Sequence, residues 1–541
     1  MRWGAFSSTT WWRALAWACG LALLLPIASL LVSLVRPLPE GNSWEHVLEN
    51  TFWPAARLSL FLTLGVCLLS CLLAIPAAWC ISNYRFFGRQ VWAVLLVLPL
   101  AVPTYIAAYV TTESREALIP WLVSLRRDHG IETYLLWESY SRHAILALMM
   151  AAVLSPYIFL AARSAFSSEG RRAAEAARLL GAGPWKTFFS ISLPIARPAL
   201  VAGLSLVAFE VLNDYGAVKH FGVPTVTVGV FRTWFGYGEA ETAARFAGWV
   251  LLAVLLLAAL ERWQRGRSSH AAAGPPPPLR SASPLVSVLS WLACGAPVAL
   301  GLGFPLAVLG SWQTRSTYAQ PFGDFLGALG NSLLLGALVT AACLLLALIV
   351  VGAARMGRGR GEAALARLGG IAGYATPGAV MALGIFSLAA LLRSWFPGAS
   401  GWGGWLLSGS FFWLVYALAA RYFAVGGQLT RQGLDSISLG LDRAAACLGR
   451  GPLASFVSVH LPLLAPALAA AAVLLFVDVC KELPLTLLLR PFGFETLATR
   501  TYGIVDEGRI FACAAPSLLL VLLCAGGLAV VETLGWRRHR S

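Results

Sequence analysis

Long apolar runs separated by short polar or basic stretches dominate this sequence. A helix that crosses a bilayer needs about 20 consecutive apolar residues, and runs of this length recur along the whole chain. The pattern predicts twelve spans, at about 12–35, 58–82, 90–110, 144–163, 199–217, 243–261, 285–310, 331–352, 368–392, 411–427, 465–488 and 512–533. We therefore expect an all-α integral membrane protein.

Composition supports this class and excludes others. Of 541 residues, 58% are hydrophobic and 12% are charged, whereas a soluble domain carries about 25% charged residues. The mean hydropathy of +0.73 excludes a soluble, disordered or fibrous protein. The ten cysteines form no C-x-x-C pair, so the sequence suggests neither a zinc site nor a disulfide framework.

The basic residues predict the orientation. If the N-terminus is cytoplasmic and the spans alternate, basic residues gather in the inner loops, as the positive-inside rule requires. These inner residues include Arg85, Arg89, Arg171, Arg172, Arg355, Arg358, Arg360 and Arg537. The net charge of +15 is then explained by topology, without nucleic-acid binding. We expect a multi-pass protein of the bacterial inner membrane with both termini cytoplasmic and an uncleaved first span.

A proline-rich break near the midpoint divides the spans into two sets of six. Residues 263–284 include the run Pro275 to Pro278, which cannot continue a helix and favours an extended cytoplasmic linker. The predicted organisation is a first span and outer loop at 1–54, a first module at 55–262, the linker at 263–284, a seventh span and outer loop at 285–328, a second module at 329–534 and a basic tail at 535–541.

The two modules share a sequence repeat. Gly181 to Pro194 reads GAGPWKTFFSISLP, and Gly449 to Pro462, in the second module, reads GRGPLASFVSVHLP. An even number of spans separates the copies, so both have the same orientation. The chain is therefore expected to hold two parallel six-helix repeats, an arrangement found in transporters.

Each copy lies in a cytoplasmic loop after the fourth span of its module, at 167–198 and 435–466. In the first loop, Ser167 to Leu180 is expected to form a helix that Gly181 ends. Pro184 suits the start of a second short helix, which Pro194 would end. An amphipathic helix that only covers the bundle is the simpler alternative, and the second copy argues against it.

The first loop resembles the signature of the permease subunits of binding-protein-dependent ABC importers, which have the type I fold. The pattern is E-A-A, three residues, G, nine residues and I-x-L-P. The matching residues are Glu175, Ala176, Ala177, Gly181, Ile191, Leu193 and Pro194. The resemblance implies that the loop docks onto an ATP-hydrolysing subunit as a coupling helix.

The second loop departs from the signature. Arg443 replaces the glutamate and Val459 replaces the isoleucine, whereas the remaining positions match; these are Ala444, Ala445, Gly449, Leu461 and Pro462. Asp442 stands one residue from Arg443 and so faces another direction on a helix. The two docking contacts need not be equivalent.

A narrower resemblance concerns fused two-module permeases for ferric iron. It is carried by Leu98 to Pro103 and Phe209 to Gly216 in the first module, and by Tyr374 to Gly378 and Lys481 to Pro491 in the second. It implies Fe(III) as cargo, with a periplasmic binding protein and two ATPase copies as partners. Thiamine or another small substrate is the alternative cargo, and an ion-gradient-driven secondary transporter is the alternative class.

The chain is not expected to be an enzyme. A P-loop requires Gly-Lys-Ser/Thr, and Lys186, Lys219 and Lys481 all lack the preceding glycine. No catalytic residue, metal-ligand set or cofactor is therefore assigned to this chain, and ATP-Mg is expected on the partner ATPase.

Five charged residues near the ends of spans are candidates for the translocation path. Glu210 and Asp214 lie four positions apart on one helical face. Asp478 and Glu482 stand at the corresponding positions of the second module, with Lys481 beside them. Charges at membrane depth are rarely without a role, and carboxylates suit a hard cation. The alternative is that these groups pack helix ends and that Lys481 neutralises Asp478 or Glu482.

Prolines at matching places predict broken or kinked spans. Pro99 and Pro103 lie in the third span, and Pro377 lies in the ninth. Such breaks are tolerated where the backbone lines a cavity or packs against neighbouring helices.

Overall fold

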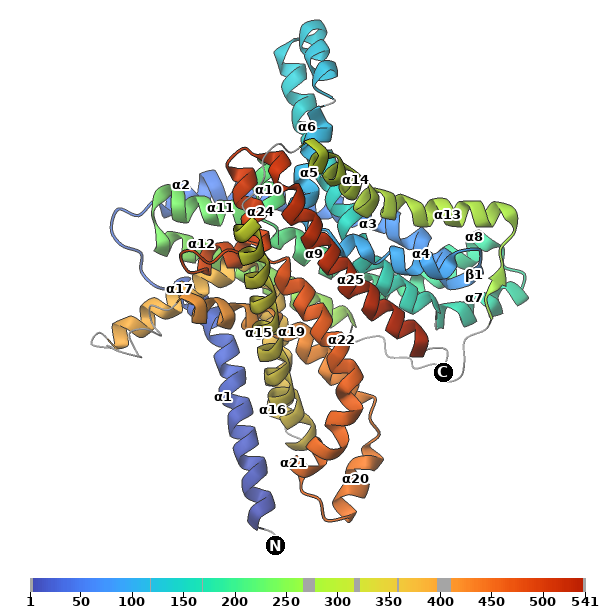
Figure 1. Cartoon of the computed structure of the whole chain (residues 1–541), viewed down its shortest axis with the longest axis vertical. Helices are drawn as coiled ribbons and strands as arrows, with labels where there is room; N and C mark the ends of the chain where they lie inside the picture. Colours follow the sequence, from blue (N-terminus) through green and yellow to red (C-terminus); the bar gives the residue numbers. More distant parts are fainter. Residues whose placement is uncertain are drawn as a thin grey trace. The chain divides into compact units, whose positions relative to one another are not determined.

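The computed structural model describes residues 3–116, 118–167, 169–265, 278–315, 322–357, 360–396 and 410–538. These residues are almost entirely helical (Figure 1). Most of the predicted linker, and the last three residues of the predicted basic tail, lie outside the described part. The module limits given above stay a prediction.

The chain folds into two compact units, and each unit takes segments from both halves of the sequence. Unit 1 comprises Met1–Trp44, Val230–Leu255 and Gln320–Arg500. Unit 2 comprises Glu45–Gly229, Leu256–Ala319 and Thr501–Ser541. The N-terminal helix thus belongs with the second half of the chain, and the C-terminal helix belongs with the first.

Unit 1 is built around α15 and α19, which pack on each other and on α22, while α1 packs along α15, α16 and α17 (Figure 1). Its helices are α1 (Trp3–Ser33), α15 (Phe322–Gly357), α16 (Arg360–Ala375), α17 (Gly378–Trp395), α19 (Ser410–Asp435), α20 (Leu439–Cys447), α21 (Pro452–Ser455), α22 (Leu461–Cys480) and α23 (Pro484–Leu489). Ser29 and Ser33 on α1 donate hydrogen bonds to Gly384 O and Ala244 O.

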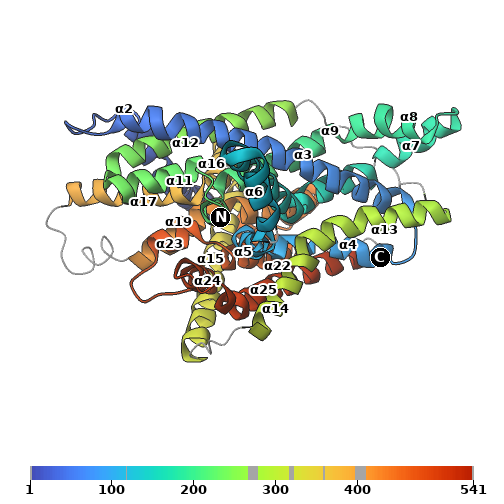
Figure 2. The same cartoon turned by 90° about the horizontal axis from the view of Figure 1, so that it is seen from above.

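Unit 2 is built around α6, which packs on α3 and α9 (Figure 2). Its helices are α3 (Trp53–Asn83), α4 (Arg89–Leu95), α5 (Thr104–Glu116), α6 (Ile119–Ser167), α7 (Glu169–Leu179), α8 (Pro184–Thr187), α9 (Leu193–Asn213), α10 (Gly216–His220), α13 (Pro284–Val298), α14 (Phe304–Arg315) and α25 (Ala514–Arg538). Strands β1 (Tyr84–Arg85) and β2 (Arg280–Ser281) form a short parallel pair in this unit.

Four further helices contain residues of both units, because they cross the limits given above. They are α2 (Trp44–Val47), α11 (Val226–Phe231), α12 (Ala240–Arg265) and α24 (Leu497–Asp506).

Ten helices of the described residues are long and apolar enough to cross a membrane, or eleven if one bent pair counts as a single span. The sequence pattern predicts twelve. The bent pair, Arg89–Ala101 with Thr104–Glu113, turns by 88°, which confirms the predicted break at Pro103. The expected span at 411–427 lies within α19, which is long enough at 26 residues but is not among the ten. Its apolar run is interrupted by Arg421 and other polar residues.

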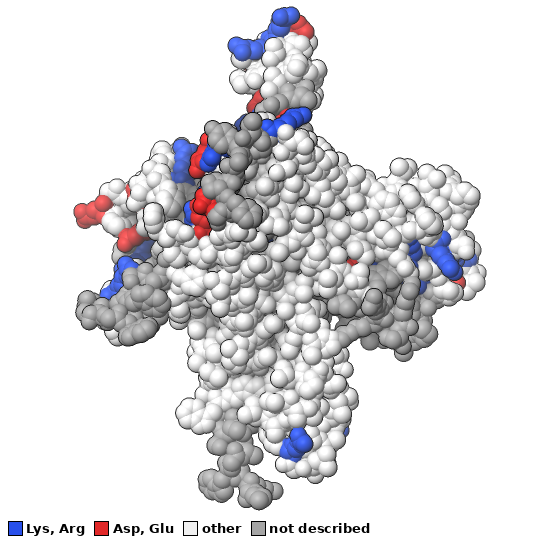
Figure 3. Space-filling model, in the orientation of Figure 1, with Lys and Arg blue, Asp and Glu red and all other residues white. Residues whose placement is uncertain are grey.

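Charged side chains are sparse on the face drawn in Figure 3, where most of the surface is neither acidic nor basic. Apolar side chains are extensively exposed on the spans, as Phe61 and Leu68 are on α3 (70% and 63% exposed). Lipid covers such surfaces in a membrane protein.

Candidate functional site: two loops and the buried charges

The loop after α7 closes with a left-handed glycine. Gly181 has φ +84°, which a residue with a side chain adopts only at a cost. The N–H of Ala182 donates to Ala177 O at 3.0 Å, and the N–H of Gly181 donates to Arg178 O at 2.9 Å. These two bonds are the Schellman pattern that satisfies the last carbonyls of a helix.

The loop after α20 repeats this geometry. Gly449 has φ +75°. Arg450 N–H donates to Ala445 O, and Gly449 N–H donates to Ala446 O, both at 3.0 Å. The helix–glycine–helix design predicted from the sequence is therefore present in each unit, although the repeat has diverged elsewhere.

The second element of each loop differs from the prediction at its end. Pro184 begins the short helix α8, as expected, and Pro452 likewise begins α21. Pro194 was expected to end this element, but helix continues through it into α9, and through Pro462 into α22. Each proline stands in the first turn of its helix, directly after a π-helical turn, where its missing N–H is tolerated.

Exposed apolar side chains recur at equivalent positions in the two loops. In the first loop, Leu180 is 88% exposed and Trp185 is 75% exposed. Their counterparts in the second loop, Leu448 and Leu453, are 80% and 47% exposed. Phe189, which stacks on Trp185 at a centroid distance of 5.9 Å, is 56% exposed. Each loop thus presents a small apolar surface among polar residues.

The signature residues divide between exposed and buried positions. Ala177 and Ala445 are buried against their own units, whereas Ala176, Ala444 and Arg443 are exposed. The remaining residues are half-buried (Glu175, Ile191, Leu193, Leu461) or exposed (Gly181, Gly449, Pro194, Pro462). Partial burial lowers the pKa of Arg171 and of Arg178, and the charge of Glu175 acts in the opposite direction on both.

Asp442 forms a charged cluster beneath the second loop that the sequence did not predict. Its Oδ1 lies 2.6 Å from Nε2 of the fully buried His460, and its Oδ2 lies 3.0 Å from Arg355. Arg355 also donates to Leu434 O and Ile437 O, at 3.1 and 2.9 Å. The cluster therefore joins the end of α19 to α20 and to the turn before α22. Asp442 is turned into the unit while Arg443 is exposed.

Asp214 is a buried carboxylate that holds the start of α10. It is 8% exposed, and its Oδ1 accepts the N–H groups of Ala217 and Val218 at 2.9 and 3.2 Å. The hydroxyl of Thr104 donates to its Oδ2. In the described part of the chain, Asp214 has no ion pair.

Glu482 plays the equivalent part in unit 1. It is 5% exposed and accepts the N–H groups of Leu485 and Thr486, both at 2.9 Å, at the start of α23. Unlike Asp214, it has a cationic partner, since Nη1 of Arg421 lies 3.6 Å from its Oε1.

The other three candidates also have partners. Lys481 Nζ lies 2.8 Å from Asp478 Oδ1. This contact agrees with the alternative that Lys481 neutralises a neighbouring carboxylate. Tyr157 donates to Glu210 across 3.5 Å. No group of three or more His, Cys, Asp and Glu residues that could hold a metal ion occurs among the described residues.

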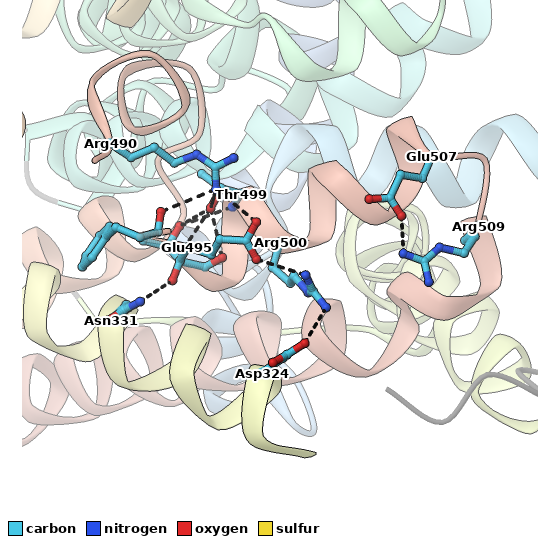
Figure 4. A network of polar contacts seen from close by, with 10 residues as sticks. Asp324, Asn331, Arg490, Glu495, Thr499, Arg500, Glu507 and Arg509 are labelled. Atoms are coloured by element: carbon cyan, nitrogen blue, oxygen red, sulfur yellow. Dashed lines mark hydrogen bonds and ion pairs between the residues drawn. The ribbon is translucent and has the colours of Figure 1, made fainter. Parts of the chain in front are cut away.

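A further polar network in unit 1 lies between Arg490 and Arg500 (Figure 4). These residues belong to the segment 489–511, which joins the predicted spans 465–488 and 512–533 and which the alternation of spans places on the outer side. Glu495 stands between Arg490 and Arg500, at 3.3 and 3.1 Å, and Arg500 reaches Asp324 at 3.3 Å. Asn331 donates to the carbonyl of Glu495 at 2.9 Å. The network fixes this segment to α15.

Known proteins resemble the chain over both short and long stretches. Residues 68–265 match the family described as binding-protein-dependent transport system inner membrane component. An Fe(3+)-transport system permease protein, FbpB 2 of Haemophilus influenzae, is 26% identical over 95% of this chain and 96% of its own length.

Shorter relatives align with a part of the chain. The molybdenum transport system permease protein ModB of Escherichia coli is 32% identical over 32% of this chain and 74% of its own length. The sulfate transport system permease protein CysT of Escherichia coli is 28% identical over 37% of this chain and 69% of its own length.

The helical fold, the apolar spans and these relatives agree on the class of protein and exclude a catalytic subunit. The chain belongs to the family of binding-protein-dependent transport system inner membrane components and is a multi-pass permease subunit of an ABC transporter.

Proposed function

We propose that this permease forms the translocation path of an ATP-driven importer for ferric iron. The observation that carries the proposal is the alignment with the ferric permease, which runs through 95% of the chain. The sulfate and molybdenum relatives align with less than two fifths of it. A periplasmic binding protein would deliver the iron, and the five charged residues described above would border or support the path.

The two loops are proposed as docking sites for two ATPase subunits, which would bind ATP-Mg. The matching exposed apolar pairs, Leu180 with Leu448 and Trp185 with Leu453, support this assignment. Burying such side chains against a partner is favourable, at about 25 cal/mol per Å² of apolar surface. This arrangement requires both loops, and with them both termini, to be cytoplasmic.

Docking is tested by adding charge to the exposed surface without changing the loop backbone. Trp185→Glu and Leu453→Glu should each reduce co-purification of the ATPase and ATP-driven uptake. Phe492→Glu is the matched control, because Phe492 is fully exposed in the predicted outer segment 489–511. If both loop variants retain the ATPase and full uptake, the docking assignment is wrong.

Cargo is tested with the permease reconstituted in vesicles together with its ATPase and binding protein. We expect ATP-dependent uptake of radiolabelled Fe(III), and no uptake of molybdate, sulfate or thiamine under the same conditions. Uptake of one of these compounds instead of iron would contradict the ferric assignment. Uptake driven by an ion gradient in vesicles without ATPase would support the secondary-transporter alternative.

A further inference from the structure

Four tyrosines gather in unit 2, at the predicted outer ends of its helices. Tyr105 and Tyr109 lie on α5, with ring centroids 5.9 Å apart. Tyr215 precedes α10 and lies 6.5 Å from Tyr502, which is in the part of α24 that belongs to unit 2. All four side chains are at most 9% exposed. Phenol oxygens are thus concentrated in one buried region.

Tyr109 is the most deeply buried of the four. It is 1% exposed, and its hydroxyl has no hydrogen-bond partner in the described part of the chain. Its ring lies 5.9 Å from that of Tyr105 and 4.8 Å from that of His220 on α10, and the charges of Tyr105, Tyr502 and Asp214 act on its hydroxyl. Burying a hydroxyl without a hydrogen bond destabilises a protein by about 1–3 kcal/mol. A ligand that binds this oxygen would remove that destabilisation.

Asp214 adds a carboxylate that has no cationic partner among the described residues. Its counterpart Glu482 is neutralised by Arg421, whereas the described residues give Asp214 the Thr104 hydroxyl and two backbone N–H groups. A buried carboxylate is normally paired or binds a metal. The region therefore has both neutral and anionic oxygen atoms to offer a cation.

A cation already lies at the exposed edge of this region. The ammonium of Lys219 is 5.0 Å from the ring centroid of Tyr502 and 5.9 Å from that of Tyr215. It donates to the Tyr502 hydroxyl, and it lies 3.0 Å from Asp506, which is 58% exposed. The faces and oxygens of these phenols thus stabilise positive charge.

Aligned positions of the second repeat hold apolar residues instead. The prolines at 103 and 377 align α5 with α17, and this alignment places Ala379 and Leu383 opposite Tyr105 and Tyr109. The spacing that relates Asp214 to Glu482 likewise places Leu487 and Leu488 at the positions of Lys219 and His220. At these four aligned positions the polar side chains of Tyr105, Tyr109, Lys219 and His220 occur in the first repeat only, which argues against a purely architectural role.

We propose that this region of unit 2 is a transit site for a hard trivalent cation, with the phenol oxygen of Tyr109 and the carboxylate of Asp214 as ligands and Tyr502 at its entrance. The inference rests on the proposed function, because Fe(III) is the cargo that this donor set fits. Hard cations prefer oxygen ligands, and tyrosine is a known ligand of ferric haem. Each phenol that binds the ion releases one proton to solvent, and iron keeps its oxidation state.

The test uses the whole complex of permease, ATPases and binding protein, with ferric citrate as the probe. Tyr109→Phe removes one oxygen that has no protein partner among the described residues, so it should leave the unfolding temperature unchanged or raised. It should lower the initial rate of Fe(III) uptake roughly ten-fold or more and abolish the visible phenolate-to-iron absorption of the loaded permease. Tyr416→Phe in unit 1, which removes a hydroxyl that donates to Ala22 O, is the control and should retain both signals.

The possible results distinguish a failure of the transit-site proposal from a failure of the proposed ferric function. If the wild-type complex imports Fe(III) and Tyr109→Phe keeps the same rate and absorption, the transit site is wrong and the ferric function stands. If the wild type imports no iron but shows an absorption that Tyr109→Phe removes, the site stands and the ferric function is wrong. Should Tyr109→Phe fail to accumulate, Asp214→Asn, which replaces the other proposed ligand, is measured in the same way, and unchanged absorption and uptake would again overturn the site.

Discussion

The guanidinium of Arg421 lies 3.6 Å from the carboxylate of Glu482, and both side chains are almost fully buried. The pair has room because residue 378 is glycine: a Cβ there would stand 2.3 Å from Arg421 Nη1 and 3.0 Å from Glu482 Oε1. The aligned position in the first repeat holds Thr104, whose hydroxyl reaches Asp214. The two repeats thus stabilise equivalent carboxylates by different means.

Arg421→Met should be strongly destabilising, because it leaves Glu482 buried without a counter-charge. Removing one partner of a buried ion pair costs about 3–5 kcal/mol. Thr104→Val, which removes only a neutral donor, should cost about 1–3 kcal/mol. Thermal unfolding of the purified permease measures both. The double variant Arg421→Met/Glu482→Gln should recover much of the loss, and equal damage by the single and double variants would refute the pairing.

Gly181→Ala and Gly449→Ala should weaken the loops through backbone strain alone. Both residues have positive φ, and a Cβ added to either would meet no atom within 4 Å, so no clash is involved. The left-handed conformation costs about 1–2 kcal/mol for a residue with a side chain. The matched controls are Gly183→Ala and Gly451→Ala, whose φ values of −65° and −69° suit any residue.

Limited proteolysis of the two loops, with thermal unfolding, distinguishes these variants. Faster cleavage in Gly181→Ala and Gly449→Ala than in the controls is the expected result. Equal cleavage in all four variants would show that the positive φ values do not constrain the loops.

Asp442→Ala should destabilise the second loop and leave the first intact. The change removes the carboxylate that faces both Arg355 and His460, and hydrogen bonds to charged groups contribute about 1.5–3 kcal/mol. Hydrogen exchange followed by mass spectrometry should show faster exchange in α20 and at the end of α19. Arg443→Ala, at the neighbouring exposed residue, is the control; the same exchange in both variants would contradict the cluster's role.

Ser59→Ala and Ser332→Ala should each cost about 0.5–2 kcal/mol, as the loss of a helix N-cap does. Ser59 Oγ accepts the N–H of Val226 at 3.0 Å, and Ser332 Oγ accepts that of Leu497 at 2.7 Å, at the starts of α11 and α24. Thr63→Val is the control, since its buried hydroxyl has no hydrogen-bond partner among the described residues. A Thr63→Val permease that unfolds as early as the serine variants would argue against specific capping.

Apolar length and proline position predicted most of the spans and the break at Pro103, because both depend on local sequence. The glycine-closed loops were predictable for the same reason. The partner of Glu482 was not, because Arg421 lies in a different helix, α19, and reaches the carboxylate only through tertiary packing. The prediction that Pro194 ends a helix was wrong, because proline is compatible with the first turn of a helix.

The assignment of helices to the two units was also beyond the sequence pattern. The pattern of apolar runs shows where the spans lie along the chain. It carries no information on which helices pack together. Thus α1, at the start of the chain, packs on α15, α16 and α17, which all lie in the second half of the sequence.

This interleaving constrains how the protein is made. When α1 leaves the ribosome, the helices that it will pack against have not yet been synthesised, so its inner face must wait in lipid or be shielded by the insertion machinery. Unit 2 in turn awaits the last helix of the chain, α25. Neither unit can form from the first half of the chain alone. A chain that ends before Arg500 leaves both units incomplete, whereas one that ends after Arg500 leaves only unit 2 incomplete.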